Sequence, residues 1–239
     1  MKRNSTTDMA ARLASGWRLF QSTKAYDGLA ATPLVLWYAS SAGGLIPALA
    51  RQLENADLER AGPAFVVSVL AQTAAIALIL LALVFLLLRR PAKARAQGAF
   101  PRFAAIAGTY LGVAVVWLPA HPMGFALSML SLLLILAGAG FAIFALLHLG
   151  RSFSLMAEAR RLVTDGPYAR IRHPLYLGEA LSMLGLTLQY SSPLAFAILA
   201  LQWMFQFERM KNEELVLLAL FPEYEAYRLR TARLVPGFY

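Results

Sequence analysis

Long apolar runs dominate the chain and alternate with short polar stretches. Four of these runs contain no charged residue and cover about residues 29–50, 62–88, 103–120 and 123–149. The hydrocarbon core of a bilayer is about 30 Å thick, and a helix needs roughly 20 apolar residues to cross it. The pattern therefore predicts four membrane-spanning helices.

A fifth apolar region covers about residues 175–207. It is too long for one helix and too short for two full spans. Ser191, Ser192 and Pro193 interrupt it near its middle, and proline breaks or restarts a helix. We interpret the region as a short helical hairpin; the alternative is one kinked or re-entrant element and five spans. The predicted fold is all-α, a polytopic integral membrane helix bundle of about six spans.

Lysine and arginine alternate between rich and poor segments along this map. Their counts are 5 before the first span, then 2, 5, 0, 5 and 0, and 5 in the tail, for a total of 22. Cytosolic loops are enriched in these residues, so we expect both termini in the cytosol, with residues 1–28 as a cytosolic N-terminal segment. We expect a bacterial inner membrane. Contact with anionic membrane lipids then explains the net charge of +9 without nucleic acid.

Composition agrees with a membrane protein and removes several kinds of chemistry. Hydrophobic residues make up 59% of the chain and charged residues 15%, where soluble domains carry about 25% charged residues. Cysteine is absent, which excludes thiolate nucleophiles and cysteine-based metal sites. The histidines His121, His148 and His173 have no ligand spacing, so we expect no metal site.

Polar side chains concentrate in residues 150–179 and 208–239, both on the predicted cytosolic face. Tyr168, Arg172, His173 and Tyr176 fall within nine positions of each other, beside turn signals at Gly166-Pro167 and Pro174. Aromatic faces attract sulfonium or ammonium groups, and arginine binds carboxylates bidentately. This set suits a ligand that carries both a cation and a carboxylate. A basic loop that contacts lipid headgroups is the alternative.

Three further charged residues are candidates for chemistry. Glu179 lies one turn into the next apolar helix, where a carboxylate costs about 2–3 kcal/mol on insertion scales, so it is either functional or paired at the interface. Arg209 and Glu213 are four apart on one helix face, which permits either a site or a local ion pair. Gly138 and Gly140 favour close helix packing over contact with a cofactor.

Several of these residues form a longer recognisable pattern. It consists of Leu162-Val163-Thr164-Asp165-Gly166-Pro167-Tyr168, Arg172-His173-Pro174-Leu175-Tyr176, Glu213-Glu214, Phe221-Pro222-Glu223-Tyr224, Tyr227 and Pro236. The pattern resembles the isoprenylcysteine carboxyl methyltransferase family and, more distantly, the phospholipid N-methyltransferases. The resemblance covers about residues 136–239, and residues 29–135 carry no recognisable motif.

The resemblance implies S-adenosylmethionine (SAM) as cofactor, held in a pocket that faces the cytosol within residues 136–239. The cofactor-binding residues that it implies are Arg160, Arg161, Leu162, Val163, Tyr168, His173, Pro174, Leu175, Tyr176 and Glu213. Arg209 matches the family's substrate-facing arginine, and Gly138 and Gly140 are similar to a Gly-x-Gly of the phospholipid enzymes. Phe153 departs from the family, because the eukaryotic carboxyl methyltransferases have a polar cofactor contact there.

The resemblance implies a SAM-dependent membrane methyltransferase of a lipophilic acceptor, with a carboxylate of an isoprenoid-type compound as the expected group. The acceptor, a small lipophilic molecule or a lipidated one, enters from the bilayer. Arg209, Arg172 and Glu179 are the candidate catalytic residues: Arg209 positions a carboxylate, and Glu179 is the base if the acceptor is an amine. The alternative is an NADPH-dependent membrane reductase of a sterol-like or isoprenoid lipid, whose Arg-His-Pro-Asn-Tyr block has Asn where this chain has Leu175. The oligomeric state is left open.

Overall fold

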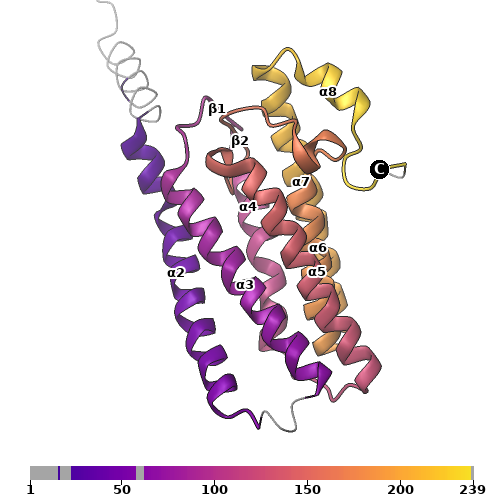
Figure 1. The fold of residues 1–239 in the computed structure, drawn as a ribbon. Helices are drawn as coiled ribbons and strands as arrows, with labels where there is room; N and C mark the ends of the chain where they lie inside the picture. The colour runs from indigo at the N-terminus through magenta and orange to yellow at the C-terminus, as the bar shows by residue number, and fades with distance from the viewer. Residues whose placement is uncertain (1–15, 17–22, 58–61, 238–239) are drawn as a thin grey trace, which may run out of the picture.

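The computed structural model of the protein describes residue 16 and residues 23–57 and 62–237. Within them the chain forms a bundle of long helices with a small polar end (Figure 1). The elements are α2 (Lys24–Glu54), α3 (Pro63–Leu88), β1 (Ala94–Arg95), α4 (Phe100–Tyr110), the 3₁₀ helix η1 (Leu111–Trp117), α5 (Phe125–Leu149), η2 (Gly150–Ser152), β2 (Glu158–Ala159), η3 (Gly166–Ala169), α6 (Pro174–Tyr190), α7 (Pro193–Leu220) and α8 (Tyr224–Arg230).

The all-α bundle predicted from the hydrophobic pattern is confirmed. Four helical stretches are long and apolar enough to cross a membrane: Gly28–Glu54, Pro63–Leu88, Phe100–Trp117 and Phe125–Ser152. They correspond to the four predicted spans to within a few residues. Most of the predicted N-terminal segment 1–28 lies outside the described residues.

The fifth apolar region forms a helical hairpin, made of α6 and α7. Pro174 and Pro193 each occupy the first turn of their helix, where the missing N–H costs no hydrogen bond. Ser192 caps α7, because its side chain accepts a hydrogen bond from the backbone N–H of Ala195 at 3.2 Å. The turn signal in the sequence therefore marks the tip of the hairpin.

Helices α5 and α6 pack with their backbones close together. A Cβ atom added at Gly138 of α5 would lie 2.4 Å from the backbone nitrogen of Ser182 in α6, and one at Gly178 would lie 2.6 Å from that of Ala142. Ser131 adds a hydrogen bond across the pair, because its hydroxyl donates to the carbonyl of Gly185 at 2.8 Å. Small residues thus permit this contact, and the contact fixes the position of α6 against α5.

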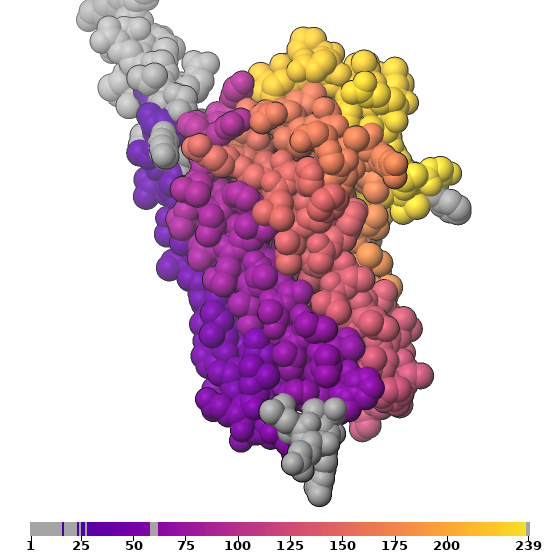
Figure 2. Space-filling view, viewed as in Figure 1, coloured from indigo at the N-terminus to yellow at the C-terminus, as the bar shows by residue number. Residues whose placement is uncertain are grey.

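The segments rich in arginine gather at one end of the bundle, which we call the polar end (residues 89–102, 150–174 and 208–237). Figure 1 shows β1, β2 and α8 at this end, together with the start of α2. Strands β1 and β2 pair antiparallel, with Ala94 opposite Ala159 and Arg95 opposite Glu158. In Figure 2 the C-terminal residues, in yellow, lie against the orange segment that precedes α6.

Candidate active site

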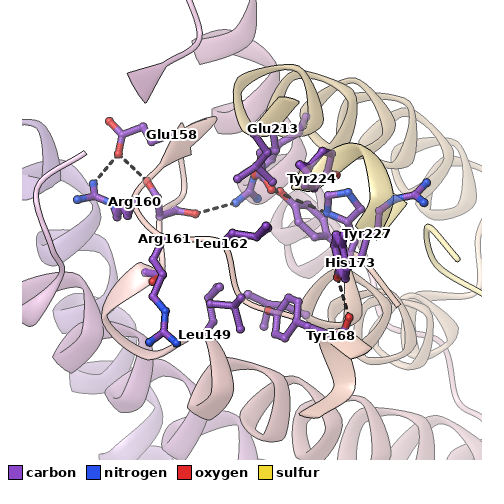
Figure 3. Close-up of a pocket in the computed structure, with 18 of the residues that line it drawn as sticks. Leu149, Glu158, Arg160, Arg161, Leu162, Tyr168, His173, Glu213, Tyr224 and Tyr227 are labelled. Carbon is purple, nitrogen blue, oxygen red and sulfur yellow. Dashed lines mark hydrogen bonds and ion pairs between the residues drawn. The ribbon is translucent and has the colours of Figure 1, made fainter. Parts of the chain in front are cut away.

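A cavity of about 760 Å³, counted with its open mouth, lies inside the polar end. This volume includes open solvent at the mouth, so the lining side chains, rather than the volume, indicate what the cavity can bind. The segment between η2 and α6 forms one wall, α7 forms the opposite wall, and α8 lies over both (Figure 3). The lining residues are Leu149, Ser152, Ser154, Met156, Glu158, Arg160, Arg161, Leu162, Val163, Tyr168, Arg172, His173, Leu175, Tyr176, Arg209, Glu213, Leu217, Tyr224 and Tyr227.

The first wall is held in place by the carboxylate of Glu158. Arg160 donates to Glu158 Oε2 at 2.5 Å, and Arg95 of the neighbouring strand donates to Glu158 Oε1 at 2.9 Å. Ser154 donates to Oε2 at 2.8 Å. The Arg160 side chain is completely buried, so this carboxylate neutralises a cation that would be costly to bury alone. The contacts fix the strand that leads into Arg161 and Leu162.

Glu213 stands on the opposite wall and is partly exposed to the cavity. The hydroxyl of Tyr176 donates to Glu213 Oε1, and Nε of Arg209 lies 3.3 Å from the same oxygen. The Arg209 guanidinium also lies 4.7 Å from the centre of the Tyr176 ring, a cation–π geometry. The three side chains form one unit, and the remaining carboxylate oxygen of Glu213 has His173 Nδ1 at 3.9 Å.

The adjacent Glu214 fastens the loop before α6 to the C-terminal segment. It accepts hydrogen bonds from Arg172 at 3.1 Å and from Arg233 at 2.9 and 3.0 Å, and His173 Nε2 lies 3.0 Å from it. Burial alone would raise the pKa of Glu214, but the hydrogen bonds from His173 and Arg233 and the nearby positive charges together hold it far below its usual range. The carboxylate therefore stays ionised.

The C-terminal segment forms the roof of the cavity. Arg172 donates to the carbonyls of Arg228 at 2.8 Å and Thr231 at 2.6 Å. The hydroxyl of Tyr227 donates to the carbonyl of Tyr168 at 2.7 Å, and burial is the main reason that the pKa of Tyr227 rises to about 12. Arg172, a candidate catalytic residue from the sequence, thus lines the cavity. Its guanidinium also stabilises the roof through these hydrogen bonds.

The structure brings together most of the residues proposed from the sequence. All the cofactor-binding candidates except Pro174 line this cavity, as do the catalytic candidates Arg209 and Arg172. Pro174 is buried at the start of α6, where it begins the helix that carries Tyr176. Glu179 lies one turn further into α6, outside this cavity.

Glu179 lines a second cavity, of about 840 Å³, between the helices of the bundle. Its other lining residues are mostly apolar: Trp37, Tyr38, Leu78, Ile79, Ala82, Gly108, Thr109, Val113, Leu146, Phe153, Leu175, Ser182, Met183, Gln202 and Gln206. Gln206 donates to Glu179 Oε2 at 3.2 Å. Leu175 lines both cavities, and Arg209 of the first cavity donates to Thr109 of the second at 3.1 Å. The two cavities therefore lie on either side of Leu175 and Arg209.

The sequence did not single out several lining residues, among them Ser152, Ser154 and Glu158, and it placed Tyr224 in the family pattern without giving it a role. The serines flank Phe153, which is 4% exposed and turns into the apolar core and the second cavity. Ser152 and Ser154 therefore present polar groups to the cavity on either side of Phe153, the position at which the related family has a polar cofactor contact. Gly138 packs against α6, as the sequence favoured, and nothing lies within 4 Å of a Cβ at Gly140.

The fold and the site together define a helical membrane protein whose polar end encloses a cavity of arginine, glutamate and tyrosine side chains. Comparison with known proteins finds a family model and individual relatives that match part of this chain. Residues 120–223 match the family described as phospholipid methyltransferase.

Three individual relatives match parts of the chain. The chain is 35% identical over 101 residues to the Protein-S-isoprenylcysteine O-methyltransferase of Schizosaccharomyces pombe, which covers 38% of this chain and 42% of that protein. It is 31% identical over 129 residues to Protein-S-isoprenylcysteine O-methyltransferase B of Arabidopsis thaliana, with coverage of 51% and 66%. It is 38% identical over 76 residues to the cobalt-zinc-cadmium resistance protein CzcN of Cupriavidus metallidurans, with coverage of 31% and 35%.

These matches confirm the resemblance to the isoprenylcysteine carboxyl methyltransferase family. The matches reach less than half the length of the S. pombe and C. metallidurans relatives. The family match and the two relatives named as methyltransferases support a membrane methyltransferase. The matched region, residues 120–223, contains every proposed site residue and ends just before the roof tyrosines.

Proposed function

We propose that the protein is a SAM-dependent methyltransferase that acts on a lipophilic acceptor, with a carboxylate of an isoprenoid-type compound as the group methylated. The observation that carries the proposal is the pair of cavities on either side of Leu175 and Arg209. The first cavity lies at the polar end, and we call it the polar cavity because charged side chains line it: Glu158, Arg160, Arg161, Arg172, Arg209 and Glu213. The other is mostly apolar and lies among the helices. A soluble methyl donor and a hydrophobic acceptor need such neighbouring sites.

The chemistry of the polar cavity fits SAM. The cofactor carries an ammonium, a carboxylate, a sulfonium and an adenine. Glu213 offers a carboxylate to the ammonium, and the exposed guanidinium of Arg161 offers a partner to the carboxylate. Tyr168 and Tyr176 offer aromatic surface to the sulfonium or the adenine, and Leu162 and Val163 add apolar walls.

When bound, SAM supplies a methyl group on a positively charged sulfur, which leaves as a neutral thioether. The protein's main task is then alignment, since orientation of two reactants contributes several kcal/mol. Arg209 holds the acceptor carboxylate, which is ionised at pH 7 and needs no general base. Its contacts with Thr109, Tyr176 and Glu213 fix the guanidinium between the two cavities.

The apolar cavity receives the hydrocarbon part of the acceptor. Trp37 comes from α2, and Leu78 and Ile79 come from α3, so helices far from the motif region also line this cavity. Glu179 is the one carboxylate among its lining residues. If the acceptor is an amine, Glu179 is positioned to take its proton, so replacement of Glu179 distinguishes the two acceptor types.

Ligand binding and product analysis test the proposal. We expect the full-length protein in detergent to bind SAM and its demethylated product in calorimetry, and not to bind NADPH. Incubation with lipid extracts and methyl-labelled SAM, followed by mass spectrometry, is expected to yield a methyl ester. Binding of NADPH without SAM would support the reductase instead. If the labelled product is instead an N-methylated amine, and if Glu179→Gln no longer forms it, the acceptor is an amine and not a carboxylate.

A further inference from the structure

Tyr224 is the one roof residue whose polar atom is left without a partner in the described part of the chain. It begins α8, is 1% exposed and lines the polar cavity. Its hydroxyl is buried and forms no hydrogen bond with any residue that the structure describes. A buried hydroxyl without a partner costs about 1–3 kcal/mol, and such groups in native proteins are rare. A bound molecule would remove this cost.

The neighbouring Tyr227 provides an internal comparison. The two rings lie 5.7 Å apart, and both line the same cavity. The hydroxyl of Tyr227 already donates to the carbonyl of Tyr168 at 2.7 Å. The hydroxyl of Tyr227 therefore attaches the roof to the wall, whereas the hydroxyl of Tyr224 is buried without a partner among the described residues.

The surroundings fix both the position and the protonation of Tyr224. The ion pairs of Glu214 with Arg172 and Arg233 attach the C-terminal segment to the loop before α6, so the phenol is held in place over the cavity. Burial, followed by the charge of Glu214, raises the pKa of Tyr224 above its ordinary value. The phenol stays neutral at physiological pH and can donate a hydrogen bond.

From these observations we propose that Tyr224 is a further cofactor-binding residue, whose hydroxyl donates a hydrogen bond to an oxygen or nitrogen atom of bound SAM. The proposal rests on the proposed function. In Figure 3 Tyr224 lies beside Glu213 and His173, across the cavity from Arg160 and Arg161. The donor is then held by the roof as well as by the two walls, and the roof is part of the binding site.

The matched variants Tyr224→Phe and Tyr227→Phe test this proposal in the full-length protein. Each removes one oxygen atom, so both keep the ring that packs in the roof. We expect Tyr224→Phe to weaken binding of SAM and of its demethylated product by about tenfold in calorimetry. Its unfolding temperature without ligand should stay the same or rise, because an unpaired buried hydroxyl is gone. Tyr227→Phe should instead lower that temperature, because it loses the bond to Tyr168.

Other outcomes would overturn the proposal. Unchanged SAM affinity in Tyr224→Phe would show that the hydroxyl does not contact the cofactor. A lower unfolding temperature of ligand-free Tyr224→Phe would show that the hydroxyl has a partner within the protein. Absence of SAM binding by the unmodified protein would contradict the proposed function itself, which separates that failure from a failure that concerns Tyr224 alone.

Discussion

At the scale of single residues, Glu213 and Glu214 show how adjacent carboxylates take different tasks. Glu214 is surrounded by His173, Arg172 and Arg233 and is saturated by their hydrogen bonds. Glu213 is partly exposed to the cavity, with Tyr176 and Arg209 on one of its oxygens. The first carboxylate maintains the structure, and the second has capacity left for a ligand.

Replacement of Glu213 tests this division. In Glu213→Gln we expect SAM to bind about 10- to 100-fold more weakly, since a hydrogen bond to a charged group contributes about 1.5–3 kcal/mol. Glu208→Gln is the matched control on the same helix, because Glu208 pairs only with Lys211 on the surface at 3.6 Å. Calorimetry with SAM measures both variants. Equal affinities in Glu213→Gln and the unmodified protein would remove Glu213 from the cofactor site.

The sequence indicated the walls of the site better than its roof. Residues 160–176 carry turn signals, a proline and a concentration of arginine and tyrosine, so their convergence could be inferred. Tyr224 belongs to the family pattern, but the pattern gave it no role, because whether its ring lines a cavity depends on how the C-terminal segment folds back. Ser152 and Ser154 could not be identified either, because they lie at the end of η2 and just after it, where no periodicity marks the residues that face the cavity.

At the scale of elements, the close contact of α5 with α6 places the site. Helix α6 carries Leu175 and Tyr176 at one end and Glu179 one turn later, so its position relative to α5 sets both cavities. The helices and the hairpin were predictable because apolar runs and Ser191-Ser192-Pro193 are local signals. Strands β1 and β2 were not, because two residues are too short to show an alternating pattern.

Two glycines of α5, two positions apart, test the packing. Gly138→Ala brings a methyl group within 2.4 Å of the backbone of Ser182, and we expect it to destabilise the protein by about 1–3 kcal/mol. Gly140→Ala meets nothing within 4 Å and should change stability by about 1 kcal/mol or less. Thermal unfolding in detergent compares them. Equal stability of the two variants would contradict the close α5–α6 contact.

At the scale of the whole molecule, the directions of the helices and the distribution of positive charge point to the same end of the bundle. The chain passes along the bundle six times, in α2, α3, α4 with η1, α5, α6 and α7, so the start of α2 and the end of α7 lie at the same end (Figure 1). The arginine-rich segments are at that end, which the distribution of positive charge predicts to be the cytosolic one. The cavity for a soluble cofactor then opens toward the compartment that contains it.

The orientation can be measured directly because the chain has no cysteine. Single cysteines at Gln97 and Glu225 mark the polar end, and those at Ala120 and Ser191 mark the opposite end; all four positions are exposed. In intact bacterial cells we expect a membrane-impermeant maleimide to label Ala120→Cys and Ser191→Cys, and to label Gln97→Cys and Glu225→Cys only after permeabilisation.

The tip of the hairpin decides between six spans and five. Helix α6 has 17 residues, which corresponds to about 25 Å at 1.5 Å per residue, somewhat less than the hydrocarbon thickness. Labelling of Ser191→Cys in intact cells would show that α6 and α7 both cross the membrane. Protection of Ser191→Cys with labelling of Ala120→Cys would make the hairpin re-entrant, and labelling of Gln97→Cys before permeabilisation would reverse the orientation. In that reversed case the polar cavity would face away from cytosolic SAM, and the proposed function would fail with it.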